Sequence, residues 1–231
     1  MIKVDLHTHA GEDPKDGLAY PATALIDKAS SLGFDALAVT LHGAVIEDER
    51  VYEHARGKGV LLVRGAEWKS PHGDVLLCNV SQADCDRLRT LEDLRALRRE
   101  RGDDVLIVAP HPYFFKHSLH RWFERYIDVF DAVEYAHLHL PWLNLNRKAV
   151  RVASRHGKPM IATSDSHGLW MLGKHYTLVD AEPTVASLFA AIRAGRVERV
   201  SPPVNIAHFV KLFITDPLFH RKEGRIIRSF D

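Results

Sequence analysis

Short apolar runs alternate with amphipathic stretches along most of the chain. Eight apolar runs have the length of buried strands: Ile2–Leu6, Ala36–Thr40, Val60–Val63, Val75–Asn79, Val105–Ala109, Ala132–Tyr135, Pro159–Thr163 and Tyr176–Val179. Six segments between them have helical spacing: Pro21–Leu32, Ile46–Arg56, Leu91–Arg101, Trp122–Phe130, Asn144–His156 and Thr184–Ala194. This alternation predicts a parallel sheet with helical crossovers. With about seven or eight strands, a closed or distorted barrel is favoured over an open sheet.

The only plausible boundary along the chain is Ser201-Pro202-Pro203. We therefore expect one domain over residues 1–200 and a C-terminal tail over residues 201–231. The tail contains an apolar, helix-like piece at Ile206–Ile214 and then a basic end. We expect it to pack against the barrel, and the alternative is a helix that binds a partner.

Composition and charge exclude several classes of protein. Hydrophobic residues make up 46% of the chain and charged residues 26%, as in an ordinary soluble protein. The net charge of +1 gives no support to broad electrostatic capture of nucleic acid or of an anionic membrane. No window approaches the ~18 apolar residues of a membrane span. The two cysteines, Cys78 and Cys85, form no metal-binding pattern, and we expect both to be reduced in a cytoplasmic chain.

Histidine is unusually frequent, with 15 residues, and several stand where strands are expected to end. His7 and His9 are one residue apart at the end of the first strand, so their side chains share a face. Asp165 and His167 repeat this spacing after a late strand. Imidazole and carboxylate are ligands that hold Zn, Mn or Fe. The pattern predicts a metal site between the first and last strands of one domain.

Other expected strands also end in acidic or imidazole side chains. In a strand–helix barrel, functional side chains collect at this end of the strands. Besides the residues above, the set comprises Asp13, Asp16, His42, Glu67, His72, Asp74, His111, Glu134, His137 and His139. Any single member is more simply a hydrogen-bonded core or loop residue. Buried together, however, they would be very costly without the positive charge that two or three divalent cations supply.

These residues resemble the PHP superfamily, named for polymerase and histidinol phosphatase. The matching motifs are Asp5-Leu6-His7-Thr8-His9, Asp16-Gly17, Thr40-Leu41-His42, Gly65-Ala66-Glu67, His111-Pro112 and Ser164-Asp165-Ser166-His167. They occur in the family's order, and the resemblance runs from residue 2 to about residue 200. It implies a distorted (β/α)7 barrel, a trinuclear site of Zn, Mn or Fe, and phosphoester hydrolysis.

The resemblance also implies which residues bind metal: His7, His9, Asp16, His42, Glu67, Asp74, His111, Asp165 and His167. The first metal would be held by His7, His9, Glu67 and Asp165. Glu67 would bridge to the second, which His111 also binds, and the third would be held by Asp16, His42 and His167.

Two positions depart from the family pattern, and one loop offers an alternative ligand. Leu41 replaces an acidic neighbour of the ligand His42. Asp74 stands where the family often has a histidine, so binding there is open, with His72 as the neighbouring candidate. Asp13 is the alternative to Asp16, or it simply starts a turn with the proline that follows it.

The resulting prediction is a metal-dependent phosphoesterase in which a metal-activated hydroxide attacks phosphorus. His111, Asp165 or His167 would relay protons to the leaving group. The compact chain favours a small phosphomonoester or nucleotide over long nucleic acid. Possible phosphate clamps are Lys69, Arg147 and Lys174, each of which is also explained as a surface cation. The arginine-rich segment 87–101 contains interspersed acids, which favours a solvated face over a nucleic-acid surface.

Two other functions compete with this prediction. Amidohydrolases, which cleave C–N or C–O bonds, also begin with His-x-His, but they usually add a lysine ligand, whereas the mid-chain ligand here is Glu67. A non-catalytic metal-binding scaffold is the third candidate, but this chain keeps nearly all of the ligands. The sequence leaves the oligomeric state open.

Overall fold

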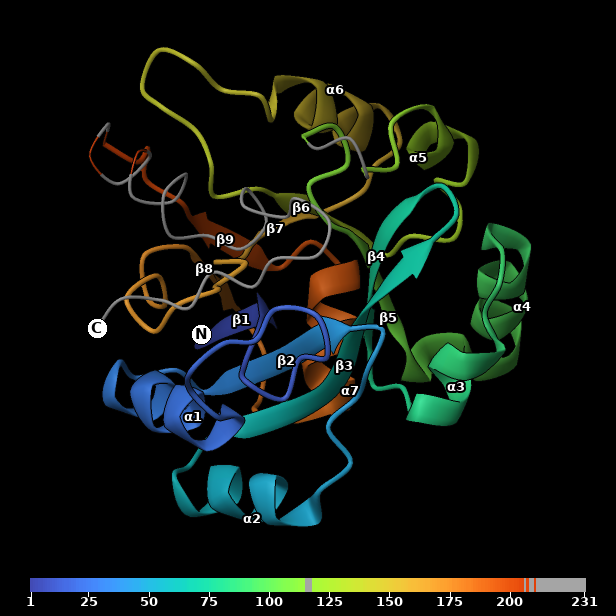
Figure 1. Cartoon of the computed structure of the whole chain (residues 1–231). Coiled ribbons are helices and arrows are strands. Elements are labelled where there is room, and N and C mark those ends of the chain that lie inside the picture. Colours follow the sequence, from blue (N-terminus) through green and yellow to red (C-terminus); the bar gives the residue numbers. More distant parts are fainter. Residues whose placement is uncertain (115–117, 206, 208–209, 211–231) are drawn as a thin grey trace.

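The computed structural model describes residues 1–114, 118–205, 207 and 210, which form one mixed sheet surrounded by helices (Figure 1). The strands are β1 (Ile2–Thr8), β2 (Ala36–His42), β3 (Leu61–Ser70), β4 (Gly73–Cys78), β5 (Leu106–Ala109), β6 (Ala132–Tyr135), β7 (Met160–Ala162), β8 (Tyr176–Val179) and β9 (Val197–Val200). The helices are α1 (Ala22–Ser31), α2 (Glu49–Gly57), α3 (Gln82–Arg87), α4 (Leu91–Arg101), α5 (Arg121–Arg125), α6 (Arg147–Arg155) and α7 (Val185–Arg193). A 3₁₀ turn, η1 (Gly102–Asp104), follows α4.

The sheet curls into a nearly closed barrel with the strand order β7-β6-β5-β4-β3-β2-β1-β8-β9. Thr8 at the end of β1 forms a parallel bridge with Ser166, which lies beyond β7. The N–H of His9 donates to the carbonyl oxygen of Ser166 over 3.0 Å. These contacts close the barrel between its first strand and the segment after β7. The predicted distorted α/β barrel is confirmed.

The expectation of a parallel sheet is wrong for part of the barrel. Strand β4 runs antiparallel to both β3 and β5, β8 runs antiparallel to β1, and β9 runs antiparallel to β8. Only Pro71 and His72 connect β3 to β4, and so short a connection cannot cross over to a parallel strand. As a result, Asp74 near the start of β4 lies beside the end of β3, paired in register with Lys69.

Two further elements, α3 and β9, are not predicted by the sequence pattern. Helix α3 is short, although its capping box of Ser81 and Asp84 is a recognisable start signal. Strand β9 is a half-exposed edge strand of four residues, so it carries little apolar signal. The helix expected over Trp122–Phe130 is shorter and earlier, because α5 ends at Arg125.

Apolar side chains fill the barrel below its polar end. Ile2, Val4 and Leu6 of β1 belong to one buried cluster with inward residues of the other strands and with Leu188 and Phe189 of α7. Separate clusters pack α1 and α2 on one side, and α4 with the segment from Leu119 to Phe130 on another. This packing fixes the strands whose ends carry the acids and imidazoles.

Asp131, just before β6, joins two helices to the barrel. Its side chain is buried, accepts the N–H of Ile107 over 2.8 Å, and lies 2.8 Å from both Arg98 Nη2 and Arg193 Nε. Removing a buried carboxylate leaves its partners unpaired, so we expect Asp131→Ala to lower the free energy of unfolding by about 3 kcal/mol. Asp128→Ala removes only an exposed pair with Arg95 and should cost less than about 1 kcal/mol. Urea unfolding of both variants measures the difference, and equal losses would contradict this role for Asp131.

Most of the predicted tail lies outside the described residues, which end at 205 apart from 207 and 210. The apolar piece at Ile206–Ile214 and the basic end therefore stay predictions. Just before them, the N–H of Val204 donates to the carbonyl oxygen of His139 over 2.8 Å, and Val204 is buried. Within the described part of the chain, no helix combines the length and apolar character needed to cross a membrane.

Candidate metal centre

A β-bulge in β1 places its histidines. Asp5 pairs with Leu37 and Thr8 pairs with Val39, so β1 has one more residue than β2 in this interval. Such a bulge re-aims side chains and is common beside active sites. Leu6 accordingly joins the inner apolar cluster, while the neighbouring His7 joins the polar end of the barrel. Both His7 and His9 are fully buried.

Three overlapping groups of candidate metal ligands lie at this end of the barrel. The first contains His7, His9 and Asp165; the second contains His7, Glu67 and His111; the third contains His9, Asp16, His42 and His167. Within each group the donor atoms lie within 4.8 Å of one another. The structure thus brings together eight of the nine residues predicted as ligands, from positions 7 to 167 of the chain.

The donor atoms are spaced as ligands of shared cations. His7 Nε2 and His9 Nε2 lie 3.2 and 3.3 Å from Asp165 Oδ1, and both lie 3.6 Å from Glu67 Oε2. Ligands about 2.1 Å from one divalent ion stand roughly 3.0–3.4 Å apart in octahedral or tetrahedral geometry. The buried Nε2 atoms of His7 and His9 make no hydrogen bond among the described residues. Spacing and chemistry both fit divalent cations.

Glu67 is central to the cluster because four imidazoles, those of His7, His9, His42 and His111, lie within 3.6 Å of its carboxylate oxygens. Its Oε2 lies 3.1 Å from His42 Nε2, and its Oε1 lies 3.3 Å from His111 Nε2. Glu67 pairs in register with His42 across β3 and β2. Gly65, two residues earlier, has room for no side chain, since a Cβ there would lie 2.9 Å from the carbonyl oxygen of Leu77. The glycine therefore lets β4 approach closely beside the carboxylate.

Two further carboxylates, those of Glu134 and Asp13, contact the Nδ1 atoms of the imidazoles and orient the rings. Glu134 Oε2 lies 2.8 Å from His7 Nδ1, and both side chains are fully buried. Asp13 Oδ2 lies 2.9 Å from His42 Nδ1 and 3.2 Å from His9 Nδ1. A carboxylate on the far nitrogen of a ligating imidazole fixes its tautomer and orientation. Glu134 was one of several strand-end candidates, and the pairing with His7 could not be read from the sequence.

Asp16 and Asp13 have different surroundings, which bears on the choice between them. Asp16 Oδ2 lies 3.1 Å from His42 Nδ1 and 3.2 Å from His167 Nε2. Asp13 also accepts the backbone N–H of His42 over 2.8 Å and that of Lys15 over 2.8 Å. These backbone contacts favour Asp13 as a positioning residue and leave Asp16 as the candidate ligand.

Neighbouring groups of opposite charge shift the pKa values of several side chains in the cluster. Burial alone would raise the pKa of Glu67 and Asp165, but the neighbouring imidazoles hold the pKa of both carboxyls well below its usual range. Burial likewise disfavours imidazolium, yet the carboxylates around His42 and His111 raise the pKa of each to about 9. In the absence of metal, these raised pKa values favour imidazolium–carboxylate pairs at His42 and His111.

Two candidate ligands have backbone conformations that L-residues rarely adopt. His111 has φ = 26° and Asp165 has φ = 46°. Positive φ at a residue other than glycine costs energy and is concentrated at functional sites. The fold tolerates this cost at both positions, each of which aims a buried side chain into the cluster.

Several sequence candidates lie outside the three ligand groups. Asp74 is buried and burial raises its pKa to about 6, but it belongs to none of the groups. His72 stacks on Trp122 instead, with ring centroids 3.8 Å apart. His137 and His139 are buried near His175, with ring centroids 5.6 and 6.5 Å from it.

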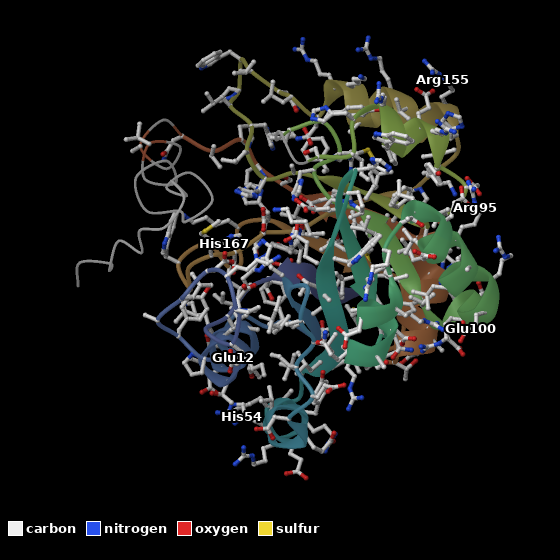
Figure 2. The ribbon with its side chains drawn as sticks, turned by 45° about the vertical axis from the view of Figure 1, so that its right-hand side comes forward. Glu12, His54, Arg95, Glu100, Arg155 and His167 are labelled. Carbon is white, nitrogen blue, oxygen red and sulfur yellow. The ribbon has the colours of Figure 1, made fainter. Side chains whose placement is uncertain are left out.

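The arginine-rich segment is explained by structural ion pairs. Arg95 lies 2.9 Å from Glu92 and 3.0 Å from Asp128, and Arg101 lies 2.6 Å from Asp84. Figure 2 shows Arg95 and Glu100 on the outside of the molecule, far from His167. This arrangement supports the interpretation of α4 as a solvated face.

Comparisons with known proteins agree with this architecture. A family model described as PHP-associated matches residues 144–197. No curated protein sequence matches the chain significantly. A two-domain protein from Bacteroides vulgatus containing a predicted PHP-like metal-dependent phosphoesterase superposes with a TM-score of 0.68 at 18% identity, covering 99% of this chain and 72% of that chain.

Two other solved structures share the fold. PsfC from Pseudomonas syringae gives a TM-score of 0.63 at 20% identity, over 87% of this chain and 91% of that chain. The lesion-specific endonuclease PfuEndoQ from Pyrococcus furiosus gives 0.60 at 15% identity, over 86% of this chain and 57% of that chain. At these identities the likeness is one of fold. Because an endonuclease shares this fold, the comparisons give no support to the expectation that a small substrate is favoured over long nucleic acid.

Proposed function

We propose that this chain, a PHP superfamily member by its fold and its family-model match, is a metal-dependent phosphoesterase acting on a phosphomonoester or nucleotide-type substrate. One observation carries the proposal. His7, Glu67 and Asp165 are distant in sequence, yet the fold brings them together with further imidazoles at one end of the barrel. Their donor spacing fits two or three divalent cations of Zn, Mn or Fe. Phosphate oxygens are a natural partner for such a cluster of cations.

The proposed ligand assignment follows the geometric groups. His7, His9, Glu67 and Asp165 would hold one ion, and Glu67 and His111 would contribute to a second. A third would be held by Asp16, His42 and His167, with His9 close to the same set. Asp74 lies outside these groups and is proposed as a further ligand.

The bound cations would supply charge neutralisation for phosphate oxygens and a lowered pKa for attacking water. The protein side chains position the reaction and move protons. Glu134 and Asp13 orient His7, His9 and His42 through their Nδ1 atoms. His167 Nδ1 lies 3.0 Å from the carbonyl oxygen of Asp165 and 3.7 Å from its Oδ1. We assign proton transfer to the leaving oxygen to His111, Asp165 or His167, which belong to the same groups of side chains.

A paired substrate screen tests the reaction class. The purified chain is assayed with Mn²⁺, Zn²⁺ or Fe²⁺ against phosphomonoesters, nucleotides, single-stranded and duplex oligonucleotides, and carboxylic amides. We expect metal-dependent release of phosphate or cleavage of a phosphoester, with no amide hydrolysis. Amide hydrolysis in place of phosphoester hydrolysis would instead assign the site to the amidohydrolase reaction, and inactivity on every substrate would favour a metal-binding scaffold.

The state of the two cysteines supports a proposal on localisation. Cys78 and Cys85 are both buried and neither forms a disulfide. We propose a cytoplasmic location, in which such thiols remain reduced.

Glu134→Gln should weaken metal binding without removing a ligand. The amide cannot hold His7 Nδ1 as the carboxylate does, and loss of such a partner typically lowers metal affinity by about 10–100-fold. Calorimetric titration with Mn²⁺ measures the change. Glu198→Gln, an exposed position on β9, is the matched control and should leave affinity unchanged. Unchanged affinity in Glu134→Gln would show that Glu134 does not support the site.

A further inference from the structure

The loop between β6 and α6 exposes an apolar tip. Trp142 is 68% exposed, Leu143 is 42% exposed and Leu145 is 49% exposed. They are three of the five exposed large apolar side chains in the described part of the chain. Figure 1 shows this segment as a long loop that projects from the barrel and leads into α6. Large apolar side chains gathered on a surface mark a place where another molecule binds.

Buried hydrogen bonds hold the base of this loop in place. The side chain of Asn146 is buried, accepts the N–H of Ala136 and donates to the carbonyl oxygen of Ala136, each over 2.9 Å. Nearer the tip, the N–H of Leu140 donates to the carbonyl oxygen of Leu143 over 2.9 Å, and the side chain of Leu140 is buried. The residues on both sides of the tip are therefore fixed. The fold presents Trp142 and Leu143 outward, although burial of these side chains would be favourable.

Helix α6 adds positive charge directly after the tip. Over residues 135–164 the sequence contains five lysines and arginines but no aspartate or glutamate, although the chain as a whole has a net charge of only +1. Arg147, Lys148 and Arg151 are exposed, and the buried residues of α6 lie on its opposite face. Arg155 is paired with an acid of α5 over 2.7 Å. Arg147 and Arg151 form no ion pair with a carboxylate among the residues that the structure describes.

We propose that the loop tip and the basic face of α6 dock the protein on the surface of an anionic phospholipid bilayer. Trp142, Leu143 and Leu145 enter the boundary between headgroups and acyl chains, where tryptophan and leucine are stabilised. The cations of α6 lie at the level of the lipid phosphates, and each adds attraction to an anionic leaflet. A single-stranded nucleic acid would use the cations and the tryptophan, but it gives the two leucines no comparable apolar environment. This docking requires neither bound metal nor the proposed reaction.

Vesicle sedimentation with the full chain tests this docking. Vesicles of phosphatidylcholine alone are compared with an equimolar mixture of phosphatidylcholine and phosphatidylglycerol. We expect the mixed vesicles to bind about tenfold more tightly or better, with a loss of affinity in high salt. The double variants Leu143→Ser/Leu145→Ser and Arg147→Gln/Arg151→Gln should each weaken binding by about tenfold or more. Arg99→Gln, which removes an exposed cation on α4, is the matched control and should bind as the wild type does.

Fluorescence quenching tests whether the tip enters the bilayer. Lipids with brominated acyl chains quench a tryptophan that reaches the acyl region. We expect quenching of the wild type on mixed vesicles that contain such lipids, and its disappearance in Trp142→Phe. The other three tryptophans are buried or half-buried, so they contribute little to this signal.

Three outcomes would overturn the docking proposal. The first is equal or no affinity for the two kinds of vesicle, or wild-type affinity in both double variants. The second is binding of a single-stranded oligonucleotide, lost in the same variants, by a chain that does not bind vesicles, which would assign the face to nucleic acid. The third is a dimer in solution that the leucine variant dissociates, again without vesicle binding, which would assign the face to a second copy of the chain. All substituted residues are exposed, and circular dichroism checks that each variant keeps the fold.

Discussion

Replacing Glu67 with Gln is expected to reduce phosphoester hydrolysis by about a thousandfold or more. Glu67 is buried, and its two oxygens face His42 and His111 at 3.1 and 3.3 Å. The amide keeps the shape of the side chain but removes the negative charge that would bridge two cations. Cation-based stabilisation of a transition state is worth several kcal/mol, and each 1.4 kcal/mol corresponds to a tenfold change in rate.

A matched histidine pair controls for general effects of substitution. His9→Ala removes a buried imidazole that lies 3.3 Å from Asp165 and should cause a comparable loss of activity. His54→Ala removes an imidazole on α2, where it pairs with Asp27 on the outer surface (Figure 2). Initial rates with added Mn²⁺, together with near-UV circular dichroism, distinguish lost chemistry from lost folding. Full activity in folded Glu67→Gln and His9→Ala would refute the metal centre.

The strands, and the acids and imidazoles at their ends, could be predicted from the sequence because both depend on the local order of apolar and polar residues. All eight expected strands are present, since short apolar runs bounded by polar turns read as strands whatever their direction. The period-2 spacing of His7 and His9 likewise indicates a shared face, although a bulge between Asp5 and Thr8 adjusts it.

Strand direction and side-chain pairing could not be predicted in the same way. The direction of β4 depends on the two-residue connection at Pro71 and His72. The general alternation of strands and helices predicts a parallel strand there and does not indicate this reversal. The partnership of His7 with Glu134 joins residues 127 positions apart, so no local spacing reveals it.

Affinity for Mn²⁺ is expected to rise by at least a hundredfold between about pH 6 and 8. Without metal, neighbouring carboxylates raise the pKa of His42 and His111 to about 9, so both imidazoles hold protons in this range. Only neutral imidazole binds a cation, and each proton displaced makes the affinity about tenfold stronger per pH unit. Calorimetric titration in buffers of different ionisation enthalpy counts the protons released.

The stability of the chelator-treated chain should change in the opposite direction. A raised imidazole pKa stabilises the fold fully below the unfolded value of about 6.5, and this stabilisation is lost as pH rises through about 9. The free energy of unfolding without metal should therefore fall from pH 7 to 9, while the stabilisation added by Mn²⁺ grows. His54→Ala should follow the wild type in both measurements. The pH dependence of metal affinity and that of stability are coupled because a cation displaces protons from these imidazoles. Metal binding that is independent of pH and releases no protons would therefore show that they are not ligands.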